Sequence, residues 1–197
     1  MPDDQHRLVP QDILPADIYA KARDEHRTRL IAMKKNRRVS VGPYVTFYFE
    51  NYHTMWQQVQ EMLRIEKGGA EQIADEIAVY NPLIPQGREL IATMMVEIDD
   101  AIARAKILRT LAGVEETAFI DIGGTRIKGT PTEYEDRTTP DGKTSSVHWI
   151  RFKFQPELIS AFRAGFGDMI LGLNHQNYRH MAVFSEDIRK ELSRDFD

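Results

Sequence analysis

Cysteine is absent from the 197 residues of this chain. Disulfides, thiolate zinc sites, cysteine nucleophiles and iron–sulfur clusters held by the chain itself are therefore excluded. Long apolar runs are also missing: the richest stretch, residues 90–98, is interrupted by Thr93 and Glu97, whereas a membrane-spanning helix needs ~20 apolar residues. The opening residues MPDDQHRLVPQD are acidic and lack the apolar core of a signal peptide. We therefore expect a cytoplasmic protein with no membrane partner.

An excess of positive charge is missing too. The chain has 26 Lys and Arg residues against 30 Asp and Glu residues, a net charge of −4. This balance argues against nucleic acid as a partner. The remaining composition, 42% hydrophobic and 28% charged, is typical of a soluble globular protein, and a chain of this length can bury a substantial core.

The spacing of apolar residues predicts helices mainly in the first half of the chain and strands mainly in the second. The expected helices are residues 16–36, 54–67, 71–80, 99–113, 156–164 and 185–196. The expected strands are residues 37–50, 89–98, 117–122, 125–134, 146–154 and 168–174. This order favours an α+β fold, a mainly antiparallel sheet with helices packed on one face. No linker separates two folding units, so we expect a single domain over 1–197, helix-rich over 10–113 and strand-rich over 114–197.

Local signals refine these boundaries. Gly42-Pro43 is expected to bend the strand over 37–50 without ending it. Thr54 stands three residues before Gln57, the spacing of a capping box, so the second helix is expected to begin near Thr54. Tyr178 and His180 are expected in a loop.

Acidic and amide side chains surround the expected junction between strand 37–50 and helix 54–67. The ligand-binding candidates are Glu50, Asn51, Gln58, Glu61 and Glu97. If these groups converge on one pocket, their oxygen and nitrogen atoms suit iron, manganese, magnesium or zinc. The alternative is structural: Asn51 and Thr54 cap the helix, while Glu50 and Glu61 pair with arginines such as Arg64.

Three further residues join the candidate metal ligands. Glu66 falls within the apolar arc of its helix, which is unusual for a carboxylate. His148 opens one expected strand and His175 closes another, so antiparallel pairing of these strands would bring both imidazoles to one sheet edge. Backbone carbonyls in the core explain the two histidines equally well. The metal candidates are therefore Glu50, Glu61, Glu66, Glu97, His148 and His175.

Glu50-x-x-His53 has the spacing of a di-iron helix motif. The pair straddles the expected helix start, and the chain holds no second copy, which a bundle di-iron site requires. We therefore reject a rubrerythrin-like di-iron centre in this chain.

A compact basic run is the candidate partner-binding segment. It contains Lys34, Lys35, Arg37 and Arg38, and residues 21–38 hold eight basic and two acidic residues, a local charge of +6. Such a segment suits phosphate, an acidic protein or RNA, and an acidic redox partner is favoured because no aromatic platform or nucleic-acid motif accompanies the run. The alternative is a solvated helix end that carries cations near its C-terminus.

The sequence also resembles a known family. The residues that carry the resemblance are Arg37-Arg38-Val39, Gly42, Phe49-Glu50-Asn51, Thr54, Gln60-Glu61-Met62, Tyr80-Asn81-Pro82-Leu83, Leu90, Ala92-Thr93 and Glu97. They resemble an uncharacterised bacterial domain-of-unknown-function family, whose genes often neighbour those of rubrerythrin and a heterodisulfide-reductase-like iron–sulfur oxidoreductase. The resemblance implies that these two proteins are partners of this chain. The shared process would be peroxide defence, which is a response to oxidative stress, or electron transfer.

Two functional hypotheses follow from these patterns. The resemblance and the lack of a recognised catalytic motif favour a non-catalytic accessory or ligand-binding protein in a rubrerythrin-linked system. The alternative is a metal-dependent enzyme with a Glu/His site and a divalent metal as its cofactor. The sequence leaves the reaction, the substrate and the oligomeric state open.

Overall fold

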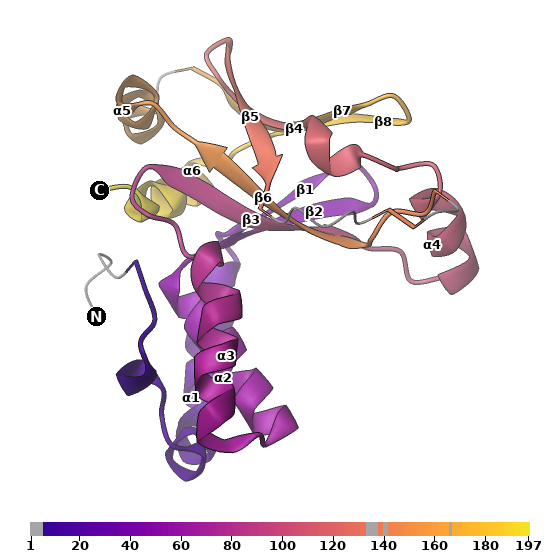
Figure 1. The fold of residues 1–197 in the computed structure, drawn as a ribbon. Coiled ribbons are helices and arrows are strands. Elements are labelled where there is room, and N and C mark those ends of the chain that lie inside the picture. Colours follow the sequence, from indigo (N-terminus) through magenta and orange to yellow (C-terminus); the bar gives the residue numbers. More distant parts are fainter. Residues whose placement is uncertain (1–5, 133–137, 140–141, 166) are drawn as a thin grey trace.

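An eight-stranded antiparallel sheet dominates the fold (Figure 1). In the computed structural model its strand order is β1-β2-β3-β6-β5-β4-β7-β8, with every neighbouring pair antiparallel. The strands are β1 (Arg38–Val41), β2 (Val45–Glu50), β3 (Glu89–Val96), β4 (Ala118–Ile122), β5 (Thr125–Pro131), β6 (Val147–Lys153), β7 (Met169–His175) and β8 (Tyr178–Val183). The structure describes residues 6–132, 138–139, 142–165 and 167–197.

Alternation along the strands separates an inner face from an outer one. In β2, Phe47 and Phe49 face inward and lie opposite Met94 and Ala92 of β3. These side chains are fully or almost fully buried. The intervening residue Tyr48 faces outward and is partly exposed. The period of two therefore builds one apolar core inside the curved sheet.

The two ends of the sheet approach each other. The hydroxyl of Tyr178 on β8 donates to the carbonyl oxygen of Val41 at 2.8 Å and accepts from the backbone N–H groups of Tyr44 (2.9 Å) and Val45 (3.1 Å). One buried side chain therefore connects the last strand to the turn between the first two.

Short helices complete the core inside the sheet. Leu108, Phe162 and Leu192 each bury their side chains in it. These residues come from α4 (Ala101–Leu108), α5 (Pro156–Ala164) and α6 (Glu186–Leu192). The 3₁₀ helices are η1 (Pro10–Asp12), η2 (Asn81–Leu83), η3 (Val114–Thr117) and η4 (Ser193–Asp195).

Three longer helices form an arm that projects from the sheet (Figure 1). This helical arm consists of α1 (Ala16–Lys34), α2 (Tyr52–Glu66) and α3 (Gly69–Tyr80). It has its own apolar cluster, which includes Val59 of α2 and Ile77 of α3. Ile91 on the outer face of β3 joins the same cluster, so β3 contributes to a core on each of its faces.

The predicted α+β class is confirmed, but two strand predictions were wrong. Gly42 adopts a φ of +72°, so Gly42-Pro43-Tyr44 forms a turn between β1 and β2, where the sequence predicted one bent strand. Glycine permits this conformation because it has no Cβ. Tyr178 and His180 lie on β8, which pairs with β7, and not in a loop.

The start of α2 also differs from the prediction. The N-cap is Asn51, whose side chain accepts from the Thr54 N–H at 3.0 Å, while the Thr54 hydroxyl accepts from the Asn51 N–H at 2.9 Å. The capping box therefore begins three residues before Thr54. This is the structural alternative that the sequence left open for these two residues.

Within the described part of the chain, no helix is both long enough and apolar enough to cross a membrane.

Candidate functional site

A small cavity of about 80 Å³ lies where the helical arm meets the sheet. We call it the junction cavity. Its lining comes from five separate parts of the chain: His6, Met33, Arg37, Asn51, Tyr52, His53, Ile84, Pro85, Glu191, Arg194 and Asp195. The cavity therefore exists only because segments distant in sequence fold together.

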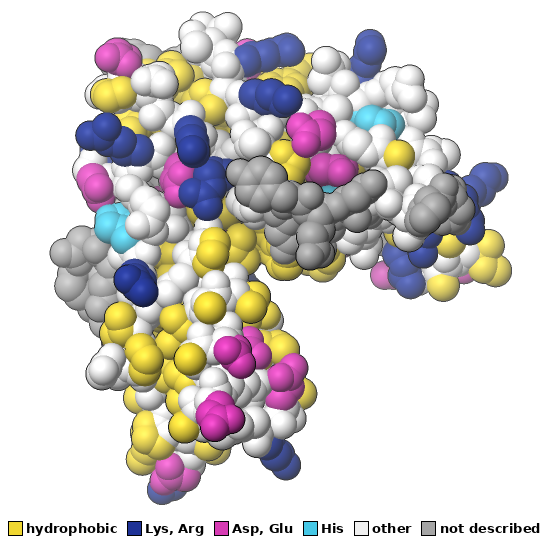
Figure 2. Space-filling view, viewed as in Figure 1, with side chains coloured by type: hydrophobic (Ala, Val, Ile, Leu, Met, Phe, Trp, Pro, Cys, Tyr) yellow, Lys and Arg dark blue, Asp and Glu magenta, His cyan; other side chains and the backbone are white. Residues whose placement is uncertain are grey.

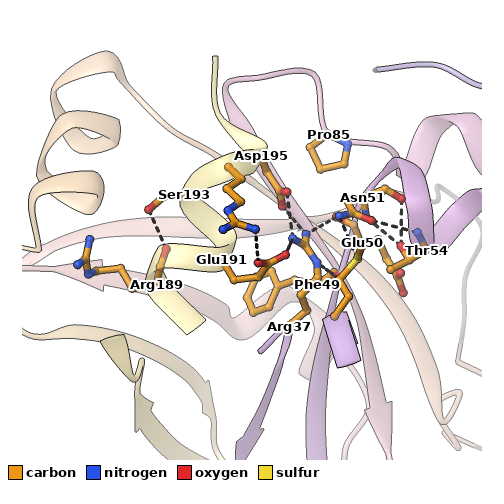
Figure 3. Close-up of polar contacts among 12 residues, drawn as sticks. Arg37, Phe49, Glu50, Asn51, Thr54, Pro85, Arg189, Glu191, Ser193 and Asp195 are labelled. Atoms are coloured by element: carbon orange, nitrogen blue, oxygen red, sulfur yellow. Dashed lines mark hydrogen bonds and ion pairs between the residues drawn. The ribbon is translucent and has the colours of Figure 1, made fainter. Parts of the chain in front are cut away.

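Arg37 is the buried centre of this junction, with 1% of its surface exposed. Its guanidinium donates to the backbone carbonyls of Phe49 (3.0 Å) and Glu50 (3.1 Å) at the end of β2. The other N–H groups reach two carboxylates (Figure 3), Asp195 at 2.5 and 3.1 Å and Glu191 at 3.3 Å. Burial acts to lower the pKa of Arg37, but Asp195 and Glu191 outweigh it and the pKa is raised. Arg37 is thus a permanent cation that joins β2 to the C-terminal helices.

The charges that line the junction cavity balance. Arg37 and Arg194 face Glu191 and Asp195, and Arg194 Nη1 donates to Glu191 Oε2 at 3.2 Å. Buried charges need such pairing because desolvation is costly. The network therefore pairs the charges that meet at the junction.

A larger open groove adjoins the cavity. This junction groove has a volume of about 410 Å³. Its lining is His6, Arg7, Ala78, Asn81, Pro82, Ile84, Gln86 and Arg151, and it shares His6 and Ile84 with the junction cavity. Figure 2 shows basic side chains and a histidine beside hydrophobic surface where the helical arm meets the sheet.

Hydrogen bonds fix the walls of the junction groove. His6 Nδ1 donates to the carbonyl oxygen of Pro85 at 2.7 Å, and its Nε2 lies 2.9 Å from Asp197 Oδ1. The Asn81 side chain accepts from the Leu8 N–H at 2.8 Å and donates to the Leu8 carbonyl at 3.1 Å. The segment that carries His6 and Arg7 is thereby held against the end of α3.

The carboxylates predicted to converge have separate partners. Glu50 Oε1 accepts from the Thr93 hydroxyl at 2.6 Å, and Glu97 Oε1 accepts from the Tyr48 hydroxyl at 2.8 Å. Glu50 is 6% exposed, and its Oε2 has no hydrogen-bond partner among the described residues.

Glu61 is bound by cations, as the structural alternative anticipated. Arg23 donates to both of its oxygens, at 2.8 and 2.9 Å, and Arg64 Nε lies 3.4 Å from Oε2. The hydrogen bond from Arg23, helped by one of 2.6 Å from the Tyr19 hydroxyl, lowers the pKa of Glu61 to about 2. Burial and the bond to Glu61 raise the pKa of Tyr19. The hydrogen bonds from Tyr19 and Arg23 to Glu61 therefore connect α1 to α2.

The remaining helix candidates lie elsewhere on the arm. Exposed Gln58 donates to the Tyr80 hydroxyl at 3.4 Å, and exposed Glu66 accepts from Gln72 Nε2 at 2.6 Å. Only Asn51, among the five ligand-binding candidates, lines the junction cavity.

The two histidine candidates are not on neighbouring strands. β5 and β4 lie between β6, which carries His148, and β7, which carries His175. His148 Nε2 donates to the carbonyl oxygen of Ser145 at 2.9 Å, and His175 Nε2 to that of Ala112 at 3.1 Å. The expected shared sheet edge is therefore wrong, and both histidines contact carbonyls as the alternative described. Across the described ranges, no three His, Asp or Glu side chains gather in a way that would hold a metal ion.

The basic run divides in the structure. Arg37 is buried, which corrects its assignment to a partner-binding surface. Lys35 and Arg38 are exposed and Lys34 is half-buried. Three of the four cations therefore remain available to a partner.

Sequence reasoning missed most of the junction. His6, Arg7, Arg151, Glu191 and Asp195 share no motif or spacing. Strand alternation places Arg151 on the outer face of β6, but it does not identify what that face meets. Only the tertiary structure brings these residues together.

Comparisons with known proteins agree with this fold. The model of a family described as "Protein of unknown function (DUF3501)" matches residues 7–196. A crystal structure of a novel protein of unknown function from Burkholderia pseudomallei K96243 is similar, with a TM-score of 0.89 and 32% identity over 96% of this chain and 99% of that one. No curated protein matches the sequence.

Proposed function

This chain belongs to the DUF3501 family, and we propose that it is a non-catalytic accessory protein that binds a small organic ligand in the junction groove. One observation carries the proposal: the groove has a volume of about 410 Å³, within the range of ~300–1,000 Å³ typical of ligand pockets. Its lining combines three apolar side chains with five polar or basic ones, so a ligand that has both apolar and polar parts can contact both kinds of surface.

The surroundings support binding because the groove is largely preformed. His6 and Asn81 are fixed by hydrogen bonds, and Arg151 is fixed by Glu89 at 2.8 Å and by the Pro82 carbonyl at 2.8 Å. Preformed walls reduce the entropy lost when a ligand binds.

A fragment screen by NMR tests this proposal. Small organic fragments should shift the amide signals of the groove residues, and Ala78→Phe should weaken that binding by about tenfold or more because the new ring occupies the groove. The matched control is Ala74→Phe, which adds the same ring to an exposed position on α3 outside the groove. Fragments that bind only elsewhere, or that bind Ala78→Phe unchanged, would refute the proposal.

The resemblance supports a second part of the proposal, a place beside rubrerythrin and an iron–sulfur oxidoreductase. Lys35 follows the C-terminal end of α1, and Arg38 begins β1. Both are exposed cations, and they suit an acidic partner surface.

Co-purification from the host tests the partner assignment. Tagged wild-type protein should recover one of the two proteins, and the Lys35→Glu/Arg38→Glu variant should recover much less, because reversed charges repel an acidic surface. The control Arg179→Glu changes an exposed charge on β8. Recovery of neither protein by the wild type contradicts this part.

A further inference from the structure

Arg7 and Arg151 are the cations that line the junction groove, and none of its described lining residues is acidic. Arg151 is paired with Glu89, which lies outside the lining. Arg7 is exposed and makes no ion pair with any residue that the structure describes. The groove therefore offers an uncompensated cation, in contrast to the junction cavity, where acidic and basic residues balance.

Arg151 offers donors in a fixed orientation. Its Nη1 donates to Glu89 Oε1 and its Nη2 to the Pro82 carbonyl, both at 2.8 Å. A guanidinium carries five N–H donors, so these two bonds fix the side chain and leave donors over. Planar guanidinium groups match the geometry of carboxylates.

The amides of the groove are already used by the protein. Asn81 bonds to the backbone of Leu8, and Gln86 Nε2 donates to the carbonyls of His6 (2.7 Å) and Ile84 (2.8 Å). Recognition of a polar ligand group thus falls mainly on the cations. Ala78, Pro82 and Ile84 supply an apolar wall beside them.

We infer that the junction groove takes a small organic anion, a carboxylate with an apolar body. The carboxylate contacts Arg7 and Arg151, and the apolar body lies against Ala78, Pro82 and Ile84. This inference rests on the proposed binding function and adds the chemical class of the ligand.

Four probes of related structure test the ligand class: hexanoate, hexanamide, hexylamine and acetate, titrated by NMR into the full chain. Hexanoate should bind at least about fivefold more tightly than hexanamide, which lacks the charge, and hexylamine should be weaker still. Acetate should bind about tenfold more weakly than hexanoate because it lacks the apolar body.

Variants locate the two contacts. Arg7→Gln should weaken hexanoate binding about fivefold and leave hexanamide unchanged, and Ala78→Phe should weaken both. Arg7 is exposed, so its substitution should not disturb the fold. Arg179→Gln, an exposed charge on β8, and Ala74→Phe should leave all titrations within twofold.

The outcomes separate this inference from the proposed function. Equal or tighter binding of hexanamide or hexylamine in the groove overturns the anion class, while the binding site itself stands. If acetate binds as tightly as hexanoate, the apolar wall does not contribute to binding and that part of the inference is wrong. If screening fragments shift the groove residues but hexanoate does not, the inference fails alone; if nothing binds there, both fail.

Discussion

The Tyr178 hydroxyl lies 2.8 Å from the Val41 carbonyl oxygen, although 137 positions separate the two residues. This buried hydroxyl also accepts from two backbone N–H groups, so it satisfies three main-chain atoms in the turn between β1 and β2. It connects the two ends of the curved sheet through one side chain.

Tyr178→Phe should destabilise the protein by about 1–3 kcal/mol. The substitution keeps the ring but leaves buried main-chain groups without a hydrogen-bond partner, and each such group carries a desolvation cost. Chemical denaturation measures the loss. Tyr44→Phe, at an exposed tyrosine, should change stability by less than about 0.5 kcal/mol. Equal effects of both substitutions would contradict the role given to Tyr178.

Gly42→Ala should be more destabilising than Gly124→Ala. Both glycines have a positive φ, of +72° and +92°, so both variants carry backbone strain. A Cβ at Gly42 would also lie 2.5 Å from His180 Cγ and 2.7 Å from the Tyr178 hydroxyl, whereas a Cβ at Gly124 would meet no heavy atom within 4 Å outside the neighbouring residues. The difference between the two losses of unfolding free energy therefore measures the steric cost of the contact between the turn and β8. Equal losses would show that the side chains of β8 move aside at no cost.

Arg37→Gln should cost about 3–5 kcal/mol, the range for breaking a buried ion pair. The variant leaves Asp195 and Glu191 without their shared cation and removes donors from two carbonyls at the end of β2. The neighbouring exposed residue supplies the control, since Arg38→Gln should stay within about 0.5 kcal/mol. A loss below about 1 kcal/mol in Arg37→Gln would contradict a central role for the network.

Glu61 should make part of the stability depend on pH. Its folded pKa of about 2 lies below the ordinary value of 4.5, so its contribution is complete above pH 4.5 and is lost as the pH falls towards 2. The melting temperatures of wild type and Glu61→Gln should therefore differ at pH 7 and converge at low pH. Glu66→Gln, at an exposed carboxylate bonded to Gln72, should show no such convergence. A constant gap for Glu61→Gln across this range would contradict the ion pair with Arg23.

Local patterns predicted most elements because they depend on neighbouring residues. The last helix was predicted to begin at residue 185, and Ser185 is its N-cap, accepting from the Ile188 N–H at 3.3 Å. β8 was missed, although Tyr178, His180 and Ala182 alternate with Arg179, Met181 and Val183. A link of two residues, Gln176 and Asn177, joins β7 to β8 and was the signal for a hairpin.

The candidate site was harder to predict because it depends on long-range contacts. Glu50, Glu61 and Glu97 were expected to converge from chemistry alone, yet each finds a nearer partner. Arg37 looked like part of a solvated basic run, and only Asp195, 158 positions away, explains its burial. Nothing in a single sequence indicates that these two residues form a pair.

The Arg37–Asp195 pair also sets an order of events during synthesis. Arg37 leaves the ribosome long before Asp195 is translated, so this ion pair cannot form until the chain has been made as far as η4. Until then the guanidinium has no carboxylate from η4 and stays in water. Because closure of such distant contacts is slow, the junction acquires its packing late, when α6 and η4 fold back onto the start of β1 and the end of β2.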